Sequence, residues 1–218
     1  MPRPKDTVTN VADQPAQHYF SSDPDVASAP SSVSLHLPDV QLDLAADRGV
    51  FSASRVDPGT KLLLLDAAQP TAAETSILDL GCGYGPIAVT LALRAPTATV
   101  WAIDVNERAR ELCAANAESA GCSNVRVAAP DAVDPDVSFD LIVSNPPIRI
   151  GKAALHELLT CWLSRLSPTG RAQLVVQKHL GSDSLAKWLT AQGWPTTRLA
   201  SRAGYRILDV GPRPAEAS

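Results

Sequence analysis

The residues with the clearest chemical meaning in this sequence are Asn145-Pro146-Pro147-Ile148, which follow the apolar segment Ile-Val-Ser. Two consecutive prolines have no backbone N–H and fix φ near about −65°, and a residue before proline is disfavoured in the helical region. The segment is therefore a stiff loop whose free hydrogen-bonding groups are the Asn145 side chain and the backbone carbonyls. Two acceptors on the hydrogens of an NH2 group would turn its conjugated lone pair towards an electrophile, an effect of preorganised dipoles. The alternative is an ordinary Pro-Pro turn after a strand.

A glycine-rich segment provides the second chemical signal. Residues 77–87 read Ile-Leu-Asp-Leu-Gly-Cys-Gly-Tyr-Gly-Pro-Ile, a short apolar strand followed by glycines at alternate positions, Gly81, Gly83 and Gly85. Glycines let the backbone turn sharply and approach a ligand closely, and the apolar pattern that follows predicts a helix whose N–H groups face the site. A nicotinamide fingerprint would place glycine where this chain has Pro86, which instead suits the first position of a helix. The dinucleotide interpretation is weakened accordingly.

Two acidic residues accompany the glycines. Asp79 stands just before the first glycine, and Asp104 ends the next apolar strand, Val-Trp-Ala-Ile-Asp (residues 100–104). Carboxylates at these positions fit a small nucleoside ligand that carries a cationic head and ribose hydroxyls. An acid about 20 residues after the glycines also occurs in nicotinamide sites, so Asp104 alone does not decide between the two ligands.

In their order and spacing, the Asp-x-Gly-x-Gly-x-Gly pattern, the acid at the end of the second strand and Asn-Pro-Pro-Ile after the fourth strand resemble the class I S-adenosylmethionine-dependent methyltransferases. Within that class the chain is similar to the small methyltransferase group, whose members include ribosomal small-subunit RNA guanine-N2 methyltransferases. The resemblance covers roughly residues 18–210 and includes the segments 51–52, 55–64, 145–152, 175–178 and 204–206.

This resemblance implies S-adenosylmethionine as the cofactor. Its methionine part and ribose would lie against the three glycines, Asp104 would bind the ribose hydroxyls, and Asp131 would meet the adenine amino group. The implied cofactor-binding residues are Asp79, Gly81, Gly83, Gly85, Asp104, Val105, Asp131, Ala132 and Asn145.

The resemblance also implies a catalytic set, Asn145, Pro146, Pro147 and Ile148, in which the Asn145 side chain and the Pro146 carbonyl hold the target nitrogen. Many relatives have Phe or Tyr where this chain has Ile148, and that aromatic ring can stack on a flipped base. Ile148 covers a ring only by dispersion, so Phe51 or Tyr84 is the candidate replacement for the missing aromatic.

The leading functional hypothesis is methyl transfer to the exocyclic N2 amine of a guanine in ribosomal RNA, with ribosomal RNA or the small ribosomal subunit as partner. Alternatives with the same Asn-Pro-Pro chemistry are a protein glutamine-amide methyltransferase and an adenine-N6 nucleic-acid methyltransferase. Relatives that modify glutamine carry a helical recognition domain ahead of the catalytic one, whereas only about 75 residues precede the glycine loop here. A non-enzymatic alternative is an inactive cofactor-binding subunit, which would not need the intact Asn145-Pro146-Pro147.

The charge of the chain is unevenly distributed. Residues 1–144 carry 9 Lys and Arg against 19 Asp and Glu, whereas residues 145–213 carry 10 against 3, a net charge of +7 in a chain whose total is −4. Basic side chains that follow the Asn-Pro-Pro loop could neutralise phosphates, and the alternative is a solvated surface. The basic residues are Arg149, Lys152, Arg171, Lys178, Lys187, Arg198, Arg202 and Arg206; the predicted substrate-binding residues are Phe51, Arg149, Lys178, Arg202 and Arg206.

The predicted fold class is α/β, a Rossmann-like doubly wound and mostly parallel seven-stranded sheet with an antiparallel strand near the C-terminus. A short N-terminal β-hairpin at about residues 33–45 precedes it. Strands are expected near 77–80, 99–103, 125–128, 139–144, 172–177, 196–200 and 205–210, and helices near 59–69, 86–95, 106–120, 153–166 and 187–192. The predicted organisation is a mobile tail at 1–17, a single methyltransferase domain at 18–210 and a tail at 211–218.

Length and composition agree with one domain. The chain has 218 residues, 45% of them hydrophobic, and its apolar runs are too short for a membrane span. Its first residues lack the apolar segment of a signal peptide, so we expect a cytoplasmic protein. The four cysteines show no Cys-x-x-Cys pairing and no nearby histidine cluster, so no metal site is expected.

Overall fold

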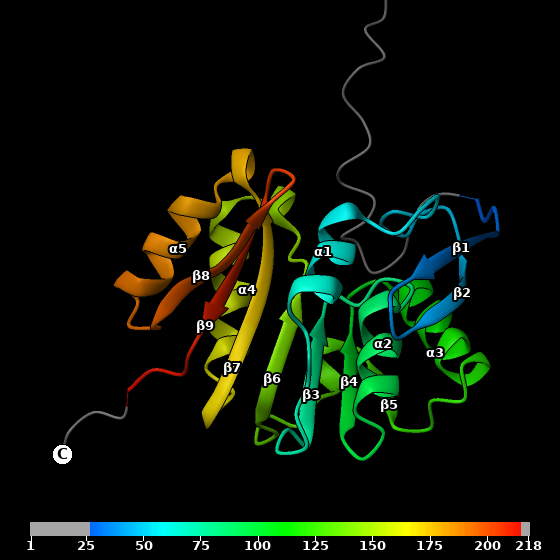
Figure 1. Cartoon of the computed structure of the whole chain (residues 1–218), viewed down its shortest axis with the longest axis horizontal. Helices are drawn as coiled ribbons and strands as arrows, with labels where there is room; N and C mark the ends of the chain where they lie inside the picture. The colour runs from blue at the N-terminus through cyan, green and yellow to red at the C-terminus, as the bar shows by residue number, and fades with distance from the viewer. Residues whose placement is uncertain (1–26, 215–218) are drawn as a thin grey trace, which may run out of the picture.

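The computed structural model describes residues 27–214, so the predicted tail at 1–17 and the last four residues lie outside the described part. Figure 1 shows a twisted sheet with helices on both faces. The seven strands have the order β5-β4-β3-β6-β7-β9-β8. Their bounds are β5 Val125–Ala128, β4 Thr99–Ile103, β3 Ser76–Leu80, β6 Phe139–Ser144, β7 Leu166–Gln177, β9 Tyr205–Val210 and β8 Thr196–Arg202.

The direction of the strands confirms the predicted fold class. Neighbouring strands from β5 to β7 are paired in parallel, whereas β9 pairs antiparallel with both β7 and β8. The parallel strands therefore end at one common edge of the sheet, the upper edge in Figure 1. In open α/β sheets ligands bind outside this carboxyl edge.

Helices cover both faces because neighbouring strand residues point to opposite sides. Ile77 packs in a buried cluster with α1 (Pro58–Asp66), α2 (Pro86–Arg94) and α3 (Glu107–Ser119). Leu78, the next residue, packs in a second cluster with α4 (Lys152–Leu163) and α5 (Ser182–Ala191). The sheet is thus doubly wound, as predicted. None of the described helices is long and apolar enough to cross a membrane.

The predicted N-terminal hairpin is present as β1 (Ser31–His36) and β2 (Gln41–Ala46), paired antiparallel from Ser31–Ala46 to His36–Gln41. It packs on the main domain through the buried residues Val33, Leu44 and Ala46, which contact Tyr84 and Ala109. The Asn116 side chain of α3 reinforces this contact, because it bonds both the N–H and the carbonyl of Ala45, at 2.8 Å each.

Several predicted element boundaries were wrong. Helix α1 ends at Asp66 instead of 69, because Ala68 has a φ of 51° and donates its N–H to the Gln173 side chain on β7. Helix α4 ends at Leu163 instead of 166, and β7 begins at Leu166 instead of 172, because Leu166 pairs with Phe139 across a bulge in β6–β7.

The last helix, predicted to contain residues 187–192, is α5, which begins at Ser182 and ends at Ala191. Gly181 precedes it with a φ of 100° and accepts the N–H of Leu185. At the C-terminus, the described part of the predicted 211–218 tail, residues 211–214, contacts the segment between α5 and β8. Gly211 donates to the Pro195 carbonyl at 2.8 Å, and the Arg213 guanidinium lies 3.9 Å from the centre of the Trp194 ring.

Candidate active site

A cavity of about 580 Å³ lies at the carboxyl ends of β3, β4, β6 and β7. That volume is within the range of about 300–1,000 Å³ usual for small-molecule sites. One end is formed by the glycine loop and the end of β4, and the other by the Asn-Pro-Pro loop and the end of β7. The two motifs that are 64 residues apart in sequence, counted from Gly81 to Asn145, therefore line the same cavity.

The glycine loop forms a cradle that side chains would fill. Gly81, Gly83 and Gly85 have φ values of 78°, 54° and 93°, a region that L residues rarely adopt. A Cβ at Gly81 would meet no atom within 4 Å, whereas one at Gly85 would lie 2.8 Å from the Cys113 sulfur. Gly81 thus leaves open space for a ligand, and Gly85 allows the loop to pack on α3.

Asp104 lines the cavity with both carboxylate oxygens oriented by the backbone. Oδ2 accepts the Gly83 N–H and Oδ1 accepts the Asn106 N–H, at 2.9 Å each. Each oxygen keeps a free lone pair, so the group can accept hydrogen bonds from two neighbouring hydroxyls. Burial raises the pKa of Asp104 above its ordinary value of 3.8. The two acceptor oxygens of Asp104 and the glycine cradle fit a nucleoside with a ribose.

Asp79 is buried beneath the glycine loop and does not line the cavity. Its Oδ2 accepts the Ala88 N–H at 2.9 Å, which ties the first turn of α2 to β3, while Oδ1 has no partner within the described residues. Burial, followed by the nearby charge of Asp104, raises the pKa of Asp79 well above its ordinary value. The predicted contact of Asp79 with the cofactor is therefore not direct.

The three other predicted cofactor residues beyond the glycine loop, Val105, Asp131 and Ala132, differ in whether they reach the cavity. Val105 is 43% exposed and lines the cavity beside Asp104. Asp131 and Ala132 belong to a short turn of 3-10 helix, Pro130–Ala132, in which Pro130 lines the cavity and the other two side chains are exposed. A contact of Asp131 with the adenine amino group stays a prediction.

The Asn-Pro-Pro loop leaves β6 in a tight turn. Ser144, the last residue of β6, donates its hydroxyl to the Leu80 carbonyl at 2.7 Å and so fixes the start of the loop beside β3. Pro147 has a φ of −74° and a ψ of 72°, and Ile148 donates its N–H to the Pro146 carbonyl at 2.8 Å. This is an inverse γ-turn. The Pro146 carbonyl therefore keeps one lone pair for a ligand.

The Asn145 side chain lines the cavity and is held on its nitrogen side. Its Nδ2 donates to Asp57 Oδ1 at 2.8 Å and to Thr60 Oγ1 at 3.0 Å. Its Oδ1 accepts no hydrogen bond from the described residues. An acceptor oxygen is therefore available at the cavity, as the sequence interpretation requires.

The two candidates for the aromatic ring that is missing at Ile148 differ in how much of the ring is exposed. Ile148 itself lines the cavity. Tyr84 is 2% exposed and packs among Val33, Leu44 and Val50, so it has little ring surface to offer a ligand. Phe51 is 47% exposed and lines the same cavity. Phe51 is accordingly the candidate for stacking on a base.

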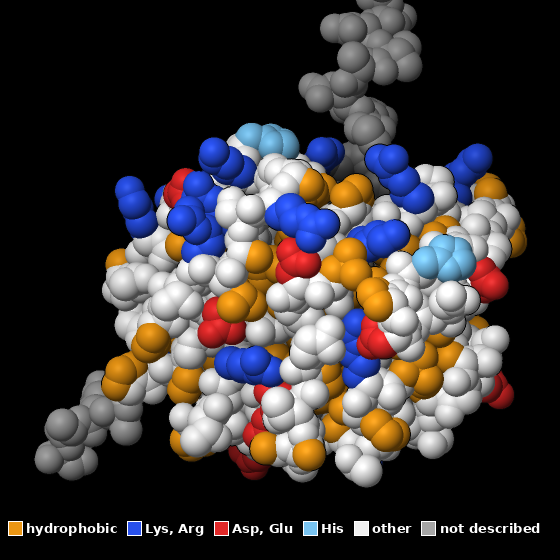
Figure 2. Space-filling model, viewed as in Figure 1, with side chains coloured by type: hydrophobic (Ala, Val, Ile, Leu, Met, Phe, Trp, Pro, Cys, Tyr) orange, Lys and Arg blue, Asp and Glu red, His pale blue; other side chains and the backbone are white. Residues whose placement is uncertain are grey.

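Basic side chains gather at the carboxyl edge of the sheet, where Figure 2 shows Lys and Arg along the upper rim of the molecule. Arg149 is exposed and lines the cavity, and Lys178 follows β7 and is exposed. Arg202 ends β8 with its side chain 66% exposed, although it lies 3.3 Å from Asp66. We refer to Arg149, Lys178 and Arg202 as the basic rim.

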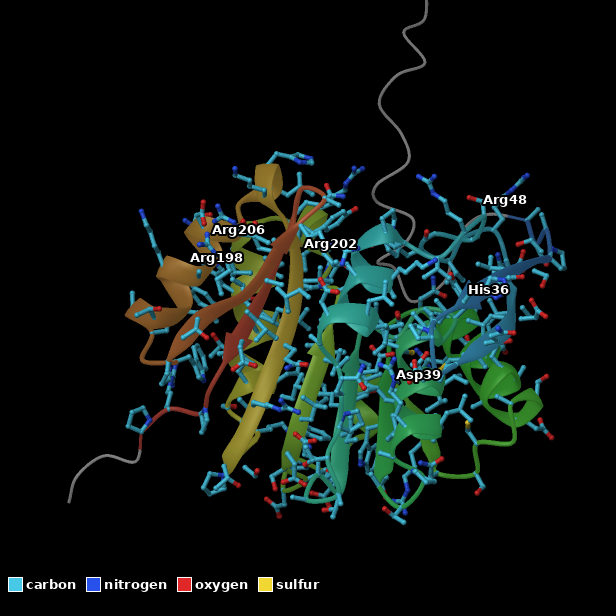
Figure 3. The ribbon with its side chains drawn as sticks, in the orientation of Figure 1. His36, Asp39, Arg48, Arg198, Arg202 and Arg206 are labelled. Carbon is cyan, nitrogen blue, oxygen red and sulfur yellow. The ribbon has the colours of Figure 1, made fainter. Side chains whose placement is uncertain are left out.

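Arg206 does not belong to this rim, and its predicted contact with substrate needs correction. The residue is 8% exposed and forms an ion pair with Asp183 of α5. Figure 3 labels it, with Arg198, on the side of the molecule that carries α5, β8 and β9. A charge that is buried and paired is not available to a phosphate. Arg171 is likewise paired, with Glu74 at 2.8 Å.

The cavity residues that were not assigned a role from sequence include Asp57, Thr60, Gln177 and Tyr205. Gln177 donates its Nε2 to the Tyr205 hydroxyl at 2.8 Å across the β7–β9 pair. Only Asp57 and Thr60 left a local signal, because Asp-Pro-Gly-Thr is a typical helix start, with Asp57 as N-cap and Pro58 in the first turn. In residues 27–214 no group of three or more His, Cys, Asp or Glu side chains could hold a metal ion.

Comparison with known proteins identifies the family. The family model for the methyltransferase small domain matches residues 41–209. YbxB of Bacillus subtilis (strain 168), an uncharacterized protein, is 37% identical over 196 residues, which are 88% of this chain and 97% of YbxB. The ribosomal RNA small subunit methyltransferase C of Shewanella amazonensis is 32% identical over 158 residues, 70% of this chain. Those residues are 46% of the Shewanella protein, so this chain spans about half of its length.

Solved structures show the same fold. The T. thermophilus 16S rRNA N2 G1207 methyltransferase (RsmC), in complex with AdoMet and guanosine, matches with a TM-score of 0.68 and 24% identity over 87% of this chain and 52% of that one. A ribosomal protein L11 methylase from Lactobacillus delbrueckii subsp. bulgaricus matches with a TM-score of 0.59 and 19% identity, over 73% of this chain and 84% of that one. At these identities the likeness concerns the fold alone. The family match, the glycine cradle and the fold agree, and the chain belongs to the methyltransferase small domain family of S-adenosylmethionine-dependent methyltransferases.

Proposed function

We propose that the enzyme methylates the exocyclic N2 amine of a guanine in the RNA of the small ribosomal subunit. The observation that carries this proposal is the Asn145 side-chain oxygen, an acceptor at the cavity whose amide nitrogen is already bonded elsewhere. An acceptor there suits a target that bears hydrogens, as an amine does.

The chain's own residues supply binding and orientation. Bound S-adenosylmethionine supplies an electrophilic methyl group, and Asp104 with the glycine loop holds its ribose. Asn145 Oδ1 and the Pro146 carbonyl accept the two amine hydrogens, which directs the nitrogen lone pair away from the ring plane towards that methyl group. Fixed dipoles of this kind need no reorganisation during the reaction. The methylated nitrogen is acidic enough to lose its proton to water, so no strong base is required.

The half of the cavity next to Asn145 supports a planar, largely apolar substrate group. Apolar side chains line it, namely Ile148, Ile150, Ala154, Leu158 and Leu180. A guanine that leaves its stack would lie against these side chains, with Phe51 as the exposed aromatic ring on which it stacks. Bases in single-stranded or loop RNA reach such a site at the least cost in unstacking.

The basic rim supports a nucleic-acid substrate over a protein. Arg149 lines the cavity, and Lys178 and Arg202 lie at the ends of β7 and β8 on the same edge of the sheet. Each phosphate that they neutralise adds salt-dependent affinity. The Shewanella amazonensis protein named ribosomal RNA small subunit methyltransferase C aligns with 70% of this chain at 32% identity. Methyl transfer to a glutamine amide or to adenine N6 would use the same two acceptors, Asn145 Oδ1 and the Pro146 carbonyl, which we call the clamp. The experiment must therefore separate the products.

The test offers tritiated S-adenosylmethionine with total RNA, small ribosomal subunits and total protein in parallel. We expect label in small-subunit RNA, and after digestion to nucleosides we expect it in N2-methylguanosine. Label in protein glutamine or in N6-methyladenosine would replace this proposal with the corresponding alternative. The Asn145→Ala variant is the control for a contaminating activity.

A further inference from the structure

The amide of Asn145 is anchored by a segment that lies almost ninety residues earlier in the chain. Its Nδ2 donates to Asp57 Oδ1 at 2.8 Å and to Thr60 Oγ1 at 3.0 Å. Both acceptors belong to the start of α1, where Asp57 is the N-cap and Thr60 lies in the first turn. Loop and helix are therefore joined at the cavity through a single side-chain amide.

This anchor determines which end of the amide faces the cavity. An Asn side chain presents either its oxygen or its NH2 group, and the two orientations are nearly isosteric. A carboxylate only accepts hydrogen bonds, so the amide nitrogen must face Asp57. With both hydrogens of Nδ2 bonded to Asp57 and Thr60, the oxygen is the atom left for a ligand.

The anchoring atoms are themselves fixed. Asp57 Oδ1 also accepts the N–H of Gly59 at 2.8 Å and that of Thr60 at 3.1 Å. The Tyr205 ring covers Gly59 so closely that a Cβ there would lie 2.6 Å from its Cε1. Thr60 is 5% exposed. The start of α1 therefore cannot shift to accommodate a rotated Asn145 amide without breaking several contacts.

We propose that Asp57 and Thr60 are positioning residues that hold the Asn145 oxygen towards the cavity and thereby restrict the target to an atom that carries hydrogens. A rotated amide would present its NH2 group, which suits an oxygen acceptor and not an amine. This inference rests on the proposed N-methylation, because it assigns Asp57 and Thr60 to the same clamp. Neither side chain needs to touch the substrate.

The test compares variants that keep the start of α1 but change the anchor. Asp57→Ser keeps a preferred N-cap residue with a shorter side chain that does not reach the amide, whereas Asp57→Asn keeps both the cap and the oxygen. Thr60→Val removes the hydroxyl at nearly constant volume, and Thr60→Ser retains it. Thr90→Val is the matched control, because Thr90 is a buried threonine of α2 whose hydroxyl bonds the Pro86 carbonyl at 2.7 Å and faces no ligand.

The readouts are the single-turnover methylation rate at saturating substrate and the Kd for the cofactor. Loss of a hydrogen bond to a charged group corresponds to roughly a 10- to 100-fold effect, and loss of a neutral one to about tenfold or less. We expect Asp57→Ser to lower the rate by about 10- to 100-fold and Thr60→Val by about fivefold, with cofactor Kd within twofold of wild type. Thr60→Ser and Asp57→Asn should recover most of the rate, and Thr90→Val should not change it.

A double-mutant cycle separates positioning from a structural effect. In an Asn145→Ala background, Asp57→Ser and Thr60→Val should cause no further loss of rate, since the group they orient is gone. Equal losses in both backgrounds, or a normal rate for both single variants, would overturn the inference. If Asp57→Ser unfolds below the assay temperature, the Thr60→Val and Thr60→Ser pair decides alone.

The cycle is run on whichever fraction the wild-type enzyme labels. If protein takes the label instead of RNA, the proposed substrate is wrong, but the cycle still reports whether Asp57 and Thr60 act through Asn145. If RNA takes the label and the cycle is additive, the proposed substrate stands and this inference fails.

Discussion

Replacing Asp104 by Ala removes a carboxylate that lines the cavity and that we predict to bind the ribose of the cofactor. Its two oxygens accept the Gly83 and Asn106 N–H groups at 2.9 Å each and keep one lone pair apiece for hydroxyls. A hydrogen bond to a charged group contributes about 1.5–3 kcal/mol, and water replaces part of this in the free protein. We expect Asp104→Ala to weaken cofactor binding by about 2 kcal/mol or more, which is roughly 30-fold or more in Kd.

The same substitution removes the two backbone contacts, which costs the fold about 2–3 kcal/mol and lowers Tm by roughly 5–10 °C. Titration calorimetry with S-adenosylhomocysteine should therefore be done well below the melting temperature of the variant. Asp136→Ala, an exposed acid away from the cavity, is the control for net charge. Wild-type affinity should also fall on acidification, starting above the ordinary carboxyl pKa of 3.8, because burial raises the pKa of Asp104 and binding needs the carboxylate.

An unchanged Kd for a folded Asp104→Ala variant would refute the ribose assignment. So would affinity for a nicotinamide cofactor that exceeds affinity for S-adenosylhomocysteine. In that case the glycine loop would bind its ligand without the acid at the end of β4.

Three further predictions concern the clamp, the basic rim and the buried acid. Asn145→Ala should remain folded and bind cofactor within a few-fold of wild type, but should lose about 10²–10³ in single-turnover rate; near-normal turnover would place the clamp elsewhere. Reversal of Arg149, Lys178 and Arg202 to Glu should weaken RNA binding and reduce the log–log salt slope by about 0.7–0.9 per lost phosphate contact. Arg126→Glu on β5, at the far edge of the sheet, should not do so, and normal methylation by the triple variant at physiological salt would favour a solvated surface. Because burial raises the folded pKa of Asp79, its neutral form stabilises the fold at low pH, and this contribution is lost as pH rises from about 3.8 towards the folded pKa. Thermal melts should show wild type losing stability relative to Asp79→Asn over that range, and parallel curves would contradict this.

Much of the fold could be predicted because the local sequence pattern and the tertiary contacts favour the same strands, helices and turns. The three loop glycines do adopt left-handed φ values, and the apolar strands alternate with amphipathic or apolar helices in the predicted order. The errors occurred where distant contacts decide the boundary. Leu166 to Gly170 reads as a polar turn, yet it extends β7 because Leu166 pairs with Phe139. Ala68 ends α1 through a bond to Gln173, which no local pattern predicts.

In the candidate site, too, residues with a local sequence signal could be predicted, whereas residues whose role depends on a distant contact could not. The place of Asn145 and Asp104 at the cavity could be predicted, because each lies at or next to the end of a strand in a recognisable motif. The anchor at Asp57 could not, because its local sequence signals only a helix start and its second role depends on a partner 88 residues away. Arg206 was misassigned because a basic residue in a strand gives no sign of whether it faces solvent or, as here, an acid on a covering helix.

The most direct test of the central claim is the chemical identity of the methylated product. Small ribosomal subunits from cells that lack the enzyme should be incubated with the purified protein and labelled S-adenosylmethionine, and the RNA digested to nucleosides for mass spectrometry. We expect one new N2-methylguanosine with the wild-type protein and none with Asn145→Ala. Label confined to protein or to a different nucleoside would contradict it.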